Sequence, residues 1–279
     1  MSEAARSAHL IGPAELQAWL ARRPDTVLLD VRHVMPADHA DRDAHLAGHL
    51  PGALFVDVDA DLAGVSTGRN GRRPLPGVTE FEKTVRRWGI DITTPVVVYG
   101  AARSPAPARA WWLLKWAGVE SVRVLDGGLG GWTGEVVSGE SEDRPESDFV
   151  IRPGRLPVVE IADVPSLAAR GLLLDARPAI KFSHPTDAGA GHIRGARSAP
   201  VTEFFDAAGF LLPDAQLRER FAALGVAEGA EGAEPAAYCS TGVSAALEVF
   251  VLSVLGVRAR LYVGSASEWT ADPSRILVR

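Results

Sequence analysis

Short apolar runs alternate with longer amphipathic stretches along this chain. The runs are rich in Val, Leu and Ala and lie at residues 28–31, 96–99, 122–125, 173–174, 236–238 and 261–263. Runs of this length and composition are typical of strands buried in a parallel sheet. Between them, apolar residues recur every three or four positions, which predicts helices at 13–23, 106–117, 214–224 and 243–255. We therefore expect an α/β fold, with mainly parallel sheets flanked by helices on both faces.

The same landmarks occur twice in the same order. The segment LLDVR at 28–32 returns as LLDAR at 173–177, and the turn AGHLPGA at 47–53 returns as AGHIRGA at 190–196. Two further matches follow. The strand and helix of 96–117 pair with 236–255, and the last strands, 122–125 and 260–263, each precede a Trp, Trp132 and Trp269. Four matches in one order indicate a diverged duplication, and hence two similar domains.

The segment between the halves lacks apolar periodicity. Residues 136–157 are rich in Ser, Glu, Asp, Pro and Gly, a composition typical of a linker. We therefore expect domains at 1–135 and 158–279, joined by a linker at 136–157. The chain has 279 residues, so each domain of about 140 residues is large enough to bury its own core.

Composition and charge exclude several classes of protein. With 47% apolar and 23% charged residues the chain is globular, and no apolar run reaches the roughly 18 residues of a membrane span. Its net charge is −6 and its 29 basic residues are scattered, so we expect no nucleic-acid surface. The first ten residues do not resemble an export signal, and we expect a cytoplasmic protein. The single Cys, which allows no intrachain disulfide, fits that reducing compartment.

The one cysteine lies where the predicted sheet would bind a ligand. Cys239 ends a strand, and the polar turn 240–244 leads directly into a helix. Ligands of parallel sheets bind at the carboxyl ends of strands, where helix N-termini present free amides and the positive end of a dipole. Such a cradle stabilises a thiolate, a persulfide or an anionic donor. A lone Cys is usually a buried core residue, but a turn of Ser, Thr and Gly is not a core segment, and we interpret Cys239 as a nucleophile.

The motif Cys-Ser-Thr-Gly-Val-Ser at 239–244 resembles the active-site loop of the rhodanese family. In particular, nearly the whole chain resembles the tandem-domain sulfurtransferases that use thiosulfate or 3-mercaptopyruvate. The resemblance implies two rhodanese-like domains, of which the second is catalytic. The first domain has Gly100 at the place of the cysteine, as in the family's non-catalytic half.

The resemblance also implies a ping-pong cycle. The Cys239 thiolate would take the outer sulfur of the donor, release sulfite or pyruvate, and pass the sulfur to cyanide or a thiol, with thioredoxin-like proteins among the acceptors. The amides of Ser240, Thr241, Gly242, Val243 and Ser244 would hold the charge throughout. No cofactor or metal is required by this chemistry.

Some positions depart from the family pattern. The hydroxyl of Thr241 favours mercaptopyruvate as donor, but the mercaptopyruvate enzymes pair that hydroxyl with a His, and Arg73 lies at the corresponding place here. An always-protonated Arg cannot act as a general base. Lys181 replaces the second domain's substrate arginine and keeps a cation without the bidentate fork. The donor therefore stays open between the two.

Two other functions share part of this pattern. Protein-tyrosine phosphatases also place a Cys before a helix, but they need an Arg where this chain has Ala245. A persulfide carrier, loaded by a protein partner and slow with small donors, fits the departures at Arg73, Lys181 and Ala266, the last of which stands where the family pattern has a Trp.

Several other polar residues are interpreted as structural. His49 and His192, and the Asp-Arg pairs of the repeat, recur in both halves, including the half without a thiol. The close spacing of His39, Asp41, Asp43 and His45 suits a single loop, which could hardly surround an ion, and no metal site is expected there.

Overall fold

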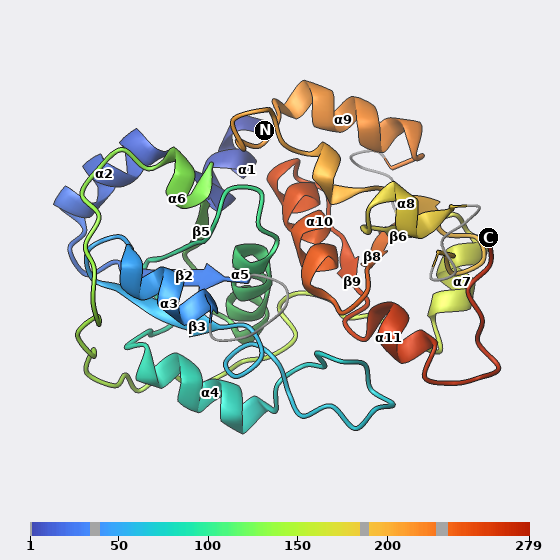
Figure 1. The fold of residues 1–279 in the computed structure, drawn as a ribbon, viewed down its shortest axis with the longest axis horizontal. Helices are drawn as coiled ribbons and strands as arrows, with labels where there is room; N and C mark the ends of the chain where they lie inside the picture. The colour runs from blue at the N-terminus through green and yellow to red at the C-terminus, as the bar shows by residue number, and fades with distance from the viewer. Residues whose placement is uncertain (1, 34–39, 185–189, 227–233) are drawn as a thin grey trace.

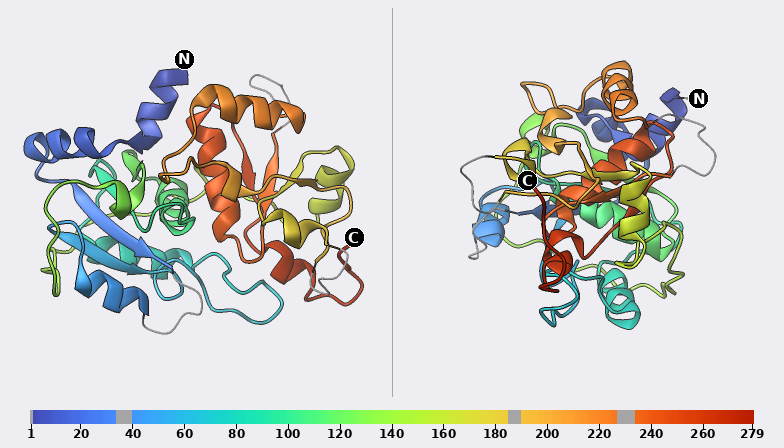
Figure 2. Two further views of the ribbon diagram at one scale, coloured as in Figure 1. Left: turned by 45° about the horizontal axis from the view of Figure 1, so that its top comes forward. Right: turned by 90° about the vertical axis from the view of Figure 1, so that its right-hand side faces the viewer.

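A computed structural model describes residues 2–33, 40–184, 190–226 and 234–279. The chain forms two α/β halves that lie side by side (Figures 1 and 2). The first half has a parallel sheet in the order β1-β5-β4-β2-β3. Its strands are β1 (Leu10–Ile11), β2 (Val27–Arg32), β3 (Ala53–Asp57), β4 (Val96–Tyr99) and β5 (Val122–Leu125).

The second half repeats this arrangement. Its parallel sheet has the order β7-β6-β8-β9, which matches β3-β2-β4-β5 of the first half. Its strands are β6 (Leu173–Asp175), β7 (Arg197–Ser198), β8 (Ala236–Tyr238) and β9 (Arg260–Leu261). A parallel bridge from Val158 to Leu261 stands where β1 borders β5. The predicted α/β fold and its duplication are confirmed.

Helices cover both faces of each sheet. In the first half they are α1 (Ser2–His9), α2 (Pro13–Arg22), α3 (Ala40–Ala47), α4 (Val78–Arg87), α5 (Ala106–Ala117) and α6 (Gly128–Gly131). In the second half they are α7 (Val164–Ala169), α8 (Ala179–Phe182), the 3-10 turn η1 (Val201–Glu203), α9 (Asp214–Ala223), α10 (Val243–Val254) and α11 (Ser265–Trp269). No helix among the described parts of the chain is long and apolar enough to cross a membrane.

Residues of one strand alternate between the two faces of the sheet. On β4, Val96 and Val98 belong to the core beside α5, whereas Val97 and Tyr99 belong to the core on the opposite face. Strands buried on both sides have no polar face, which explains the continuous apolar runs in the sequence.

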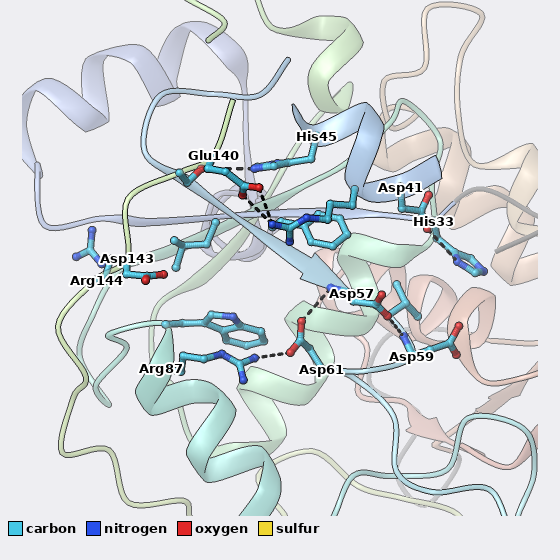
Figure 3. A pocket seen from close by; sticks show the side chains of 16 residues that line it. His33, Asp41, His45, Asp57, Asp59, Asp61, Arg87, Glu140, Asp143 and Arg144 are labelled. Carbon is cyan, nitrogen blue, oxygen red and sulfur yellow. Dashed lines mark hydrogen bonds and ion pairs between the residues drawn. The ribbon is translucent and has the colours of Figure 1, made fainter. Parts of the chain in front are cut away.

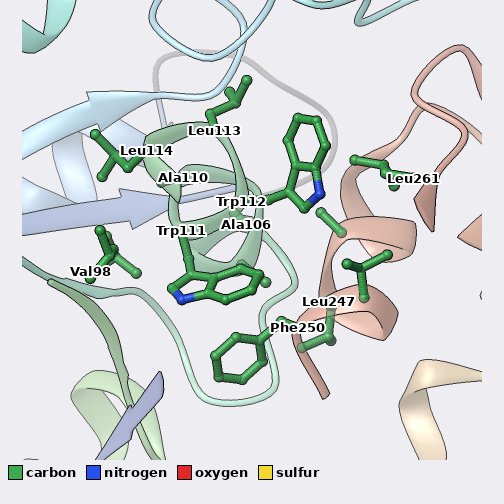
Figure 4. Close-up of a cluster of buried hydrophobic side chains, with 14 of the residues drawn as sticks. Val98, Ala106, Ala110, Trp111, Trp112, Leu113, Leu114, Leu247, Phe250 and Leu261 are labelled. Carbon is green, nitrogen blue, oxygen red and sulfur yellow. The ribbon is translucent and has the colours of Figure 1, made fainter. Parts of the chain in front are cut away.

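The two halves share one core, built around α5 and α10. These helices run side by side at the junction (Figure 1), and their apolar residues belong to a single cluster. Trp111 of α5 meets Phe250 of α10 edge to face, with ring centroids 5.1 Å apart (Figure 4). Both helices are buried nearly all round, as expected for elements enclosed between two sheets. Trp111 therefore packs at the junction between the two halves.

The repeated polar residues brace the loops of each half. The Asp30 carboxylate pairs with Arg32, and Asp175 pairs with Arg177, at 2.6–3.2 Å. The ring of His49 bonds the His45 carbonyl at 2.9 Å, and the ring of His192 bonds the Phe182 carbonyl at 3.1 Å. Their predicted structural role is confirmed.

The segment around Asp41, Asp43 and His45 is not the single loop that was expected. These residues belong to helix α3, and the His45 ring contacts Asp30 at 2.8 Å. His39 lies outside the described residues. The helix forms here because 40–47 contains good helix formers and acidic residues in its first turn.

The segment 136–157, expected to be a linker, packs along the first half. Val137 bridges to His49, the Arg152 amide donates to the Ala117 carbonyl at 2.8 Å, and Phe149 is buried. At the other end of that half, α1 crosses to the second half and packs against α10. Arg6 pairs with Asp214 at 2.7 Å in this contact.

The contact made by α1 is expected to weaken in acid. The ring of His9 meets Trp111 edge to face at 5.3 Å, and burial, aided by Lys115, lowers the pKa of His9 to about 4 from 6.5. A His with a lowered folded-state pKa contributes stability above pH 6.5 that is lost as pH falls toward 4, by up to about 3 kcal/mol. Urea unfolding across this range should show that loss in the parent and not in His9→Phe, which keeps a ring but cannot titrate. Parallel curves for the two proteins would contradict this account.

Candidate active site

Cys239 lies at the carboxyl end of β8, in the turn that leads into α10. Its side chain is buried, and the Sγ atom accepts a hydrogen bond from the Gly242 amide at 3.0 Å. The Cys239 amide donates to Ser265 Oγ at 3.1 Å. Ser265 Oγ is 4.0 Å from Sγ, but the Ser265 hydroxyl donates its hydrogen bond to the Tyr262 carbonyl at 2.9 Å. The thiol is therefore held by backbone amide and helix dipole.

Gly242 makes this geometry possible. It caps α10 in the left-handed region, with φ +84°, so its amide turns toward Sγ. A Cβ at this position would lie 2.5 Å from the Val263 carbonyl oxygen. Both the backbone conformation and the space therefore require glycine.

The remaining residues of the predicted loop surround the thiol. Ser240 is exposed, Thr241 and Val243 are buried, and Ser244 is half-buried in the first turn of α10. Gly242 provides the amide bonded to Sγ, and the loop itself is anchored on the α11 side. There the Ala266 amide donates to the Cys239 carbonyl and the Ser267 amide to the Ser240 carbonyl.

The first half covers this loop with its segment 57–76. Arg73 Nη1 donates to Thr241 Oγ1 at 3.2 Å and holds Asp59 through two further bonds, at 2.6 and 2.9 Å. Those bonds hold the pKa of Asp59 below its usual value. The Arg72 amide donates to Ser267 Oγ at 3.0 Å. Arg73 is therefore brought to the loop, but its guanidinium is already engaged by Asp59.

The first half keeps the shape of the loop without its chemistry. Gly100 follows β4 as Cys239 follows β8, and Arg103 has a positive φ of 62°, as Gly242 does. The second half reaches this loop at Gly209, which lies against Ala102, and Phe210 packs next to it against Gly127 and Gly131. Without a thiol, and with an aromatic ring filling the adjacent space, this loop has no group that could carry sulfur.

Lys181 lies on α8, exposed, in the connection that follows β6. Because β6 neighbours β8 in a parallel sheet, α8 and Cys239 lie at the same edge of the sheet. A role for Lys181 stays a prediction.

Three charged residues near the thiol were not found from the sequence. Asp59 pairs with Arg73, Arg109 of α5 lies fully buried behind Gly242, and Glu248 of α10 is fully buried without a hydrogen-bond partner among the described residues. Burial, with Asp175 and Cys239 nearby, raises the pKa of Glu248 well above its usual value, because the charged carboxylate is disfavoured there. The sequence offered one signal: Arg109 and Glu248 interrupt the apolar faces of the two predicted helices.

A cavity of about 620 Å³ lies in the first half, beside the site (Figure 3). Its wall includes Arg87, which pairs with Asp61 at 2.5 Å, and Asp59, which also holds Arg73. The Cys239 loop does not line this cavity. Asp59 is thus the link between the cavity and the thiol loop.

Comparison with known proteins agrees with the fold. The model of the rhodanese-like domain matches residues 12–135 and 161–272. A probable 3-mercaptopyruvate sulfurtransferase of Pseudomonas aeruginosa is 39% identical, over 96% of this chain and 97% of the relative. A putative thiosulfate sulfurtransferase of Mycobacterium tuberculosis is 37% identical, over 97% of each chain. The crystal structure of the 3-mercaptopyruvate sulfurtransferase of Escherichia coli has a TM-score of 0.79 at 30% identity, over 92% of this chain and 98% of that one.

The chain has the fold class of a two-domain α/β protein, with two parallel sheets of matching strand order and its single thiol at the end of a strand. The chain belongs to the rhodanese-like family. It is a sulfurtransferase, as its resemblance to that family implied.

Proposed function

We propose that this sulfurtransferase moves sulfane sulfur from thiosulfate or 3-mercaptopyruvate to cyanide or a thiol, through a persulfide on Cys239. The observation that carries the proposal is the 3.0 Å bond from the Gly242 amide to Sγ at the N-terminus of α10. Amide and helix dipole stabilise negative charge on the sulfur, and this charge is present both before and after loading.

The cycle has two half-reactions. The Cys239 thiolate attacks the outer sulfur of the donor, and an S–S bond forms as the bond from that sulfur to the rest of the donor breaks. The electron pair of the broken bond leaves with sulfite, or with the enolate of pyruvate, which then takes up a proton. An acceptor thiolate or cyanide attacks the outer sulfur of the persulfide and releases the Cys239 thiolate.

Cations near the loop would attract either donor, since both donors are anions. Arg73 lies against Thr241, and the Thr241 hydroxyl and Lys181 remain the proposed donor contacts. The relatives are named for one donor or the other, and we propose both for this chain. In the predicted division into domains 1–135 and 158–279, the first domain would cover the active site of the second.

The alternative is a persulfide carrier that a protein partner loads. Cys239 is 3% exposed, and segment 57–76 covers its loop. A small donor reaches such a thiol more easily than a protein does, so this burial favours the small-donor enzyme. A thioredoxin-like acceptor would have to contact the rim around Ser240, the exposed residue of the loop.

Intact-protein mass after brief exposure to each donor tests the proposal. We expect a gain of about 32 Da, one sulfur atom, with at least one donor, and its loss on addition of cyanide or a thiol. Cys239→Ala is the control and should gain nothing. If protein with a free thiol gains no mass from either donor, the small-donor enzyme is wrong and the partner-loaded carrier replaces it.

A further inference from the structure

A buried arginine from the first half lies directly behind the catalytic loop. Arg109 is on α5, its side chain has no exposed surface, and a Cβ at Gly242 would lie 3.3 Å from its Nη1 atom. Gly242 is the residue whose amide bonds Sγ. One residue therefore separates the guanidinium from the sulfur.

One side of this guanidinium is bonded and the other is not. Its Nη2 atom contacts the carbonyls of Leu62, Arg73 and Pro74 at 3.2–3.3 Å, all on the segment that covers the loop. Its Nε and Nη1 atoms have no hydrogen-bond partner among the described residues. A buried hydrogen-bond donor without a partner costs free energy. An unpaired guanidinium behind an anion site therefore indicates that it has a function in that site.

Arg109 remains charged in this environment. Burial lowers its pKa to about 10, while the nearby Cys239 opposes that shift. The other ionisable groups around the thiol stabilise an anion less well, because Glu248 is an acid and the Arg73 guanidinium is held by Asp59. A buried positive charge is screened weakly by solvent and acts at longer range than a surface charge.

We propose that Arg109 is a positioning residue of the sulfur-transfer site, supplied by the non-catalytic half. Its Nη2 atom fixes the covering segment that carries Arg73, and its charge stabilises the anionic forms of Cys239 through the loop. The first half then does more than cover the site, because α5 supplies a positive charge that the second half lacks there. This inference rests on the proposed function, since it assigns Arg109 to the same sulfur chemistry.

The test measures the thiolate directly. Cys239 is the only thiol in the chain, so the ultraviolet absorption of its thiolate against pH, with Cys239→Ala subtracted, reports on this residue alone. Arg109→Gln removes the charge and keeps a polar side chain of similar width. Its titration midpoint should rise by about one pH unit, a tenfold smaller thiolate fraction below the midpoint. Arg109→Lys keeps a charge, and its midpoint should stay within about a third of a unit.

The control is Arg123→Gln, which also removes a nearly buried arginine of the first half. Arg123 pairs with Glu15 at 2.9 Å and lies over Trp19, away from the loop. Its midpoint should equal that of the parent, so a rise that appears in Arg123→Gln as well would reflect general destabilisation and overturn the proposal.

Two further results would overturn it: a folded Arg109→Gln with the parent titration, or an Arg109→Lys midpoint raised by a full unit. If Arg109→Gln does not fold, Arg109→Lys alone tests the proposal, and a midpoint raised by a full unit overturns it. The titration uses no donor, so it judges Arg109 independently of loading. Failure of the parent to gain mass from donors would instead count against the proposed function.

Discussion

Replacement of Cys239 by Ala is expected to reduce sulfur transfer from both donors by about a thousandfold or more, to the background rate. The physical reason is that no other atom can take its place. The chain has no second thiol, and the neighbouring Ser265 hydroxyl already bonds the Tyr262 carbonyl at 2.9 Å. The measurement is steady-state formation of thiocyanate from thiosulfate, and of pyruvate from 3-mercaptopyruvate.

The fold should survive this change. Removing one buried sulfur atom leaves a small cavity, which costs about 1 kcal/mol of unfolding free energy. Ser253→Ala, near the other end of α10, removes only a hydroxyl that bonds the Val249 carbonyl and should keep the parent rate. Transfer of sulfur by Cys239→Ala from either donor, at a rate near that of Ser253→Ala, would show that the persulfide cycle is wrong.

Replacement of Gly242 by Ala is expected to be nearly as damaging, although it adds only a methyl group. At φ +84° an L-residue costs about 1 to 2 kcal/mol, and the new Cβ would lie 2.5 Å from the Val263 carbonyl. The loop must move to relieve this contact, which takes the Gly242 amide away from Sγ. We expect transfer to fall about a hundredfold, since losing one preorganised donor to an anion costs that much, with a loss of about 3 kcal/mol of stability.

The matched control is Gly52→Ala. Gly52 also has a positive φ, of 73°, but a Cβ there would meet no atom within 4 Å. This variant should lose about 1 kcal/mol of stability in urea unfolding and keep full activity. Equal losses of activity in the two variants would mean that backbone strain alone, rather than the position of the Gly242 amide, explains the effect.

Local pattern predicted most of the fold. The helices predicted at 106–117 and 243–255 are α5 and α10, within one residue of their ends. The apolar runs correspond to β2, β4, β5, β6, β8 and β9. Such patterns are readable because a strand buried on both faces, or a helix enclosed between two sheets, must be apolar along its length. Helix α3 was missed because its sequence is polar and lacks the apolar periodicity that marks the other helices.

The candidate site divides in the same way. The sequence by itself determined the duplication, the strand-to-helix turn and the position of Cys239 within it, because neighbouring residues determine a turn and its cap. Only the tertiary structure decided which charges surround the thiol. Arg109 and Asp59 come from the first half, far from Cys239 in sequence, and reach it because α5 packs on α10 and segment 57–76 lies over the loop. Contacts of this kind depend on how two domains dock, and no local pattern of residues records that docking.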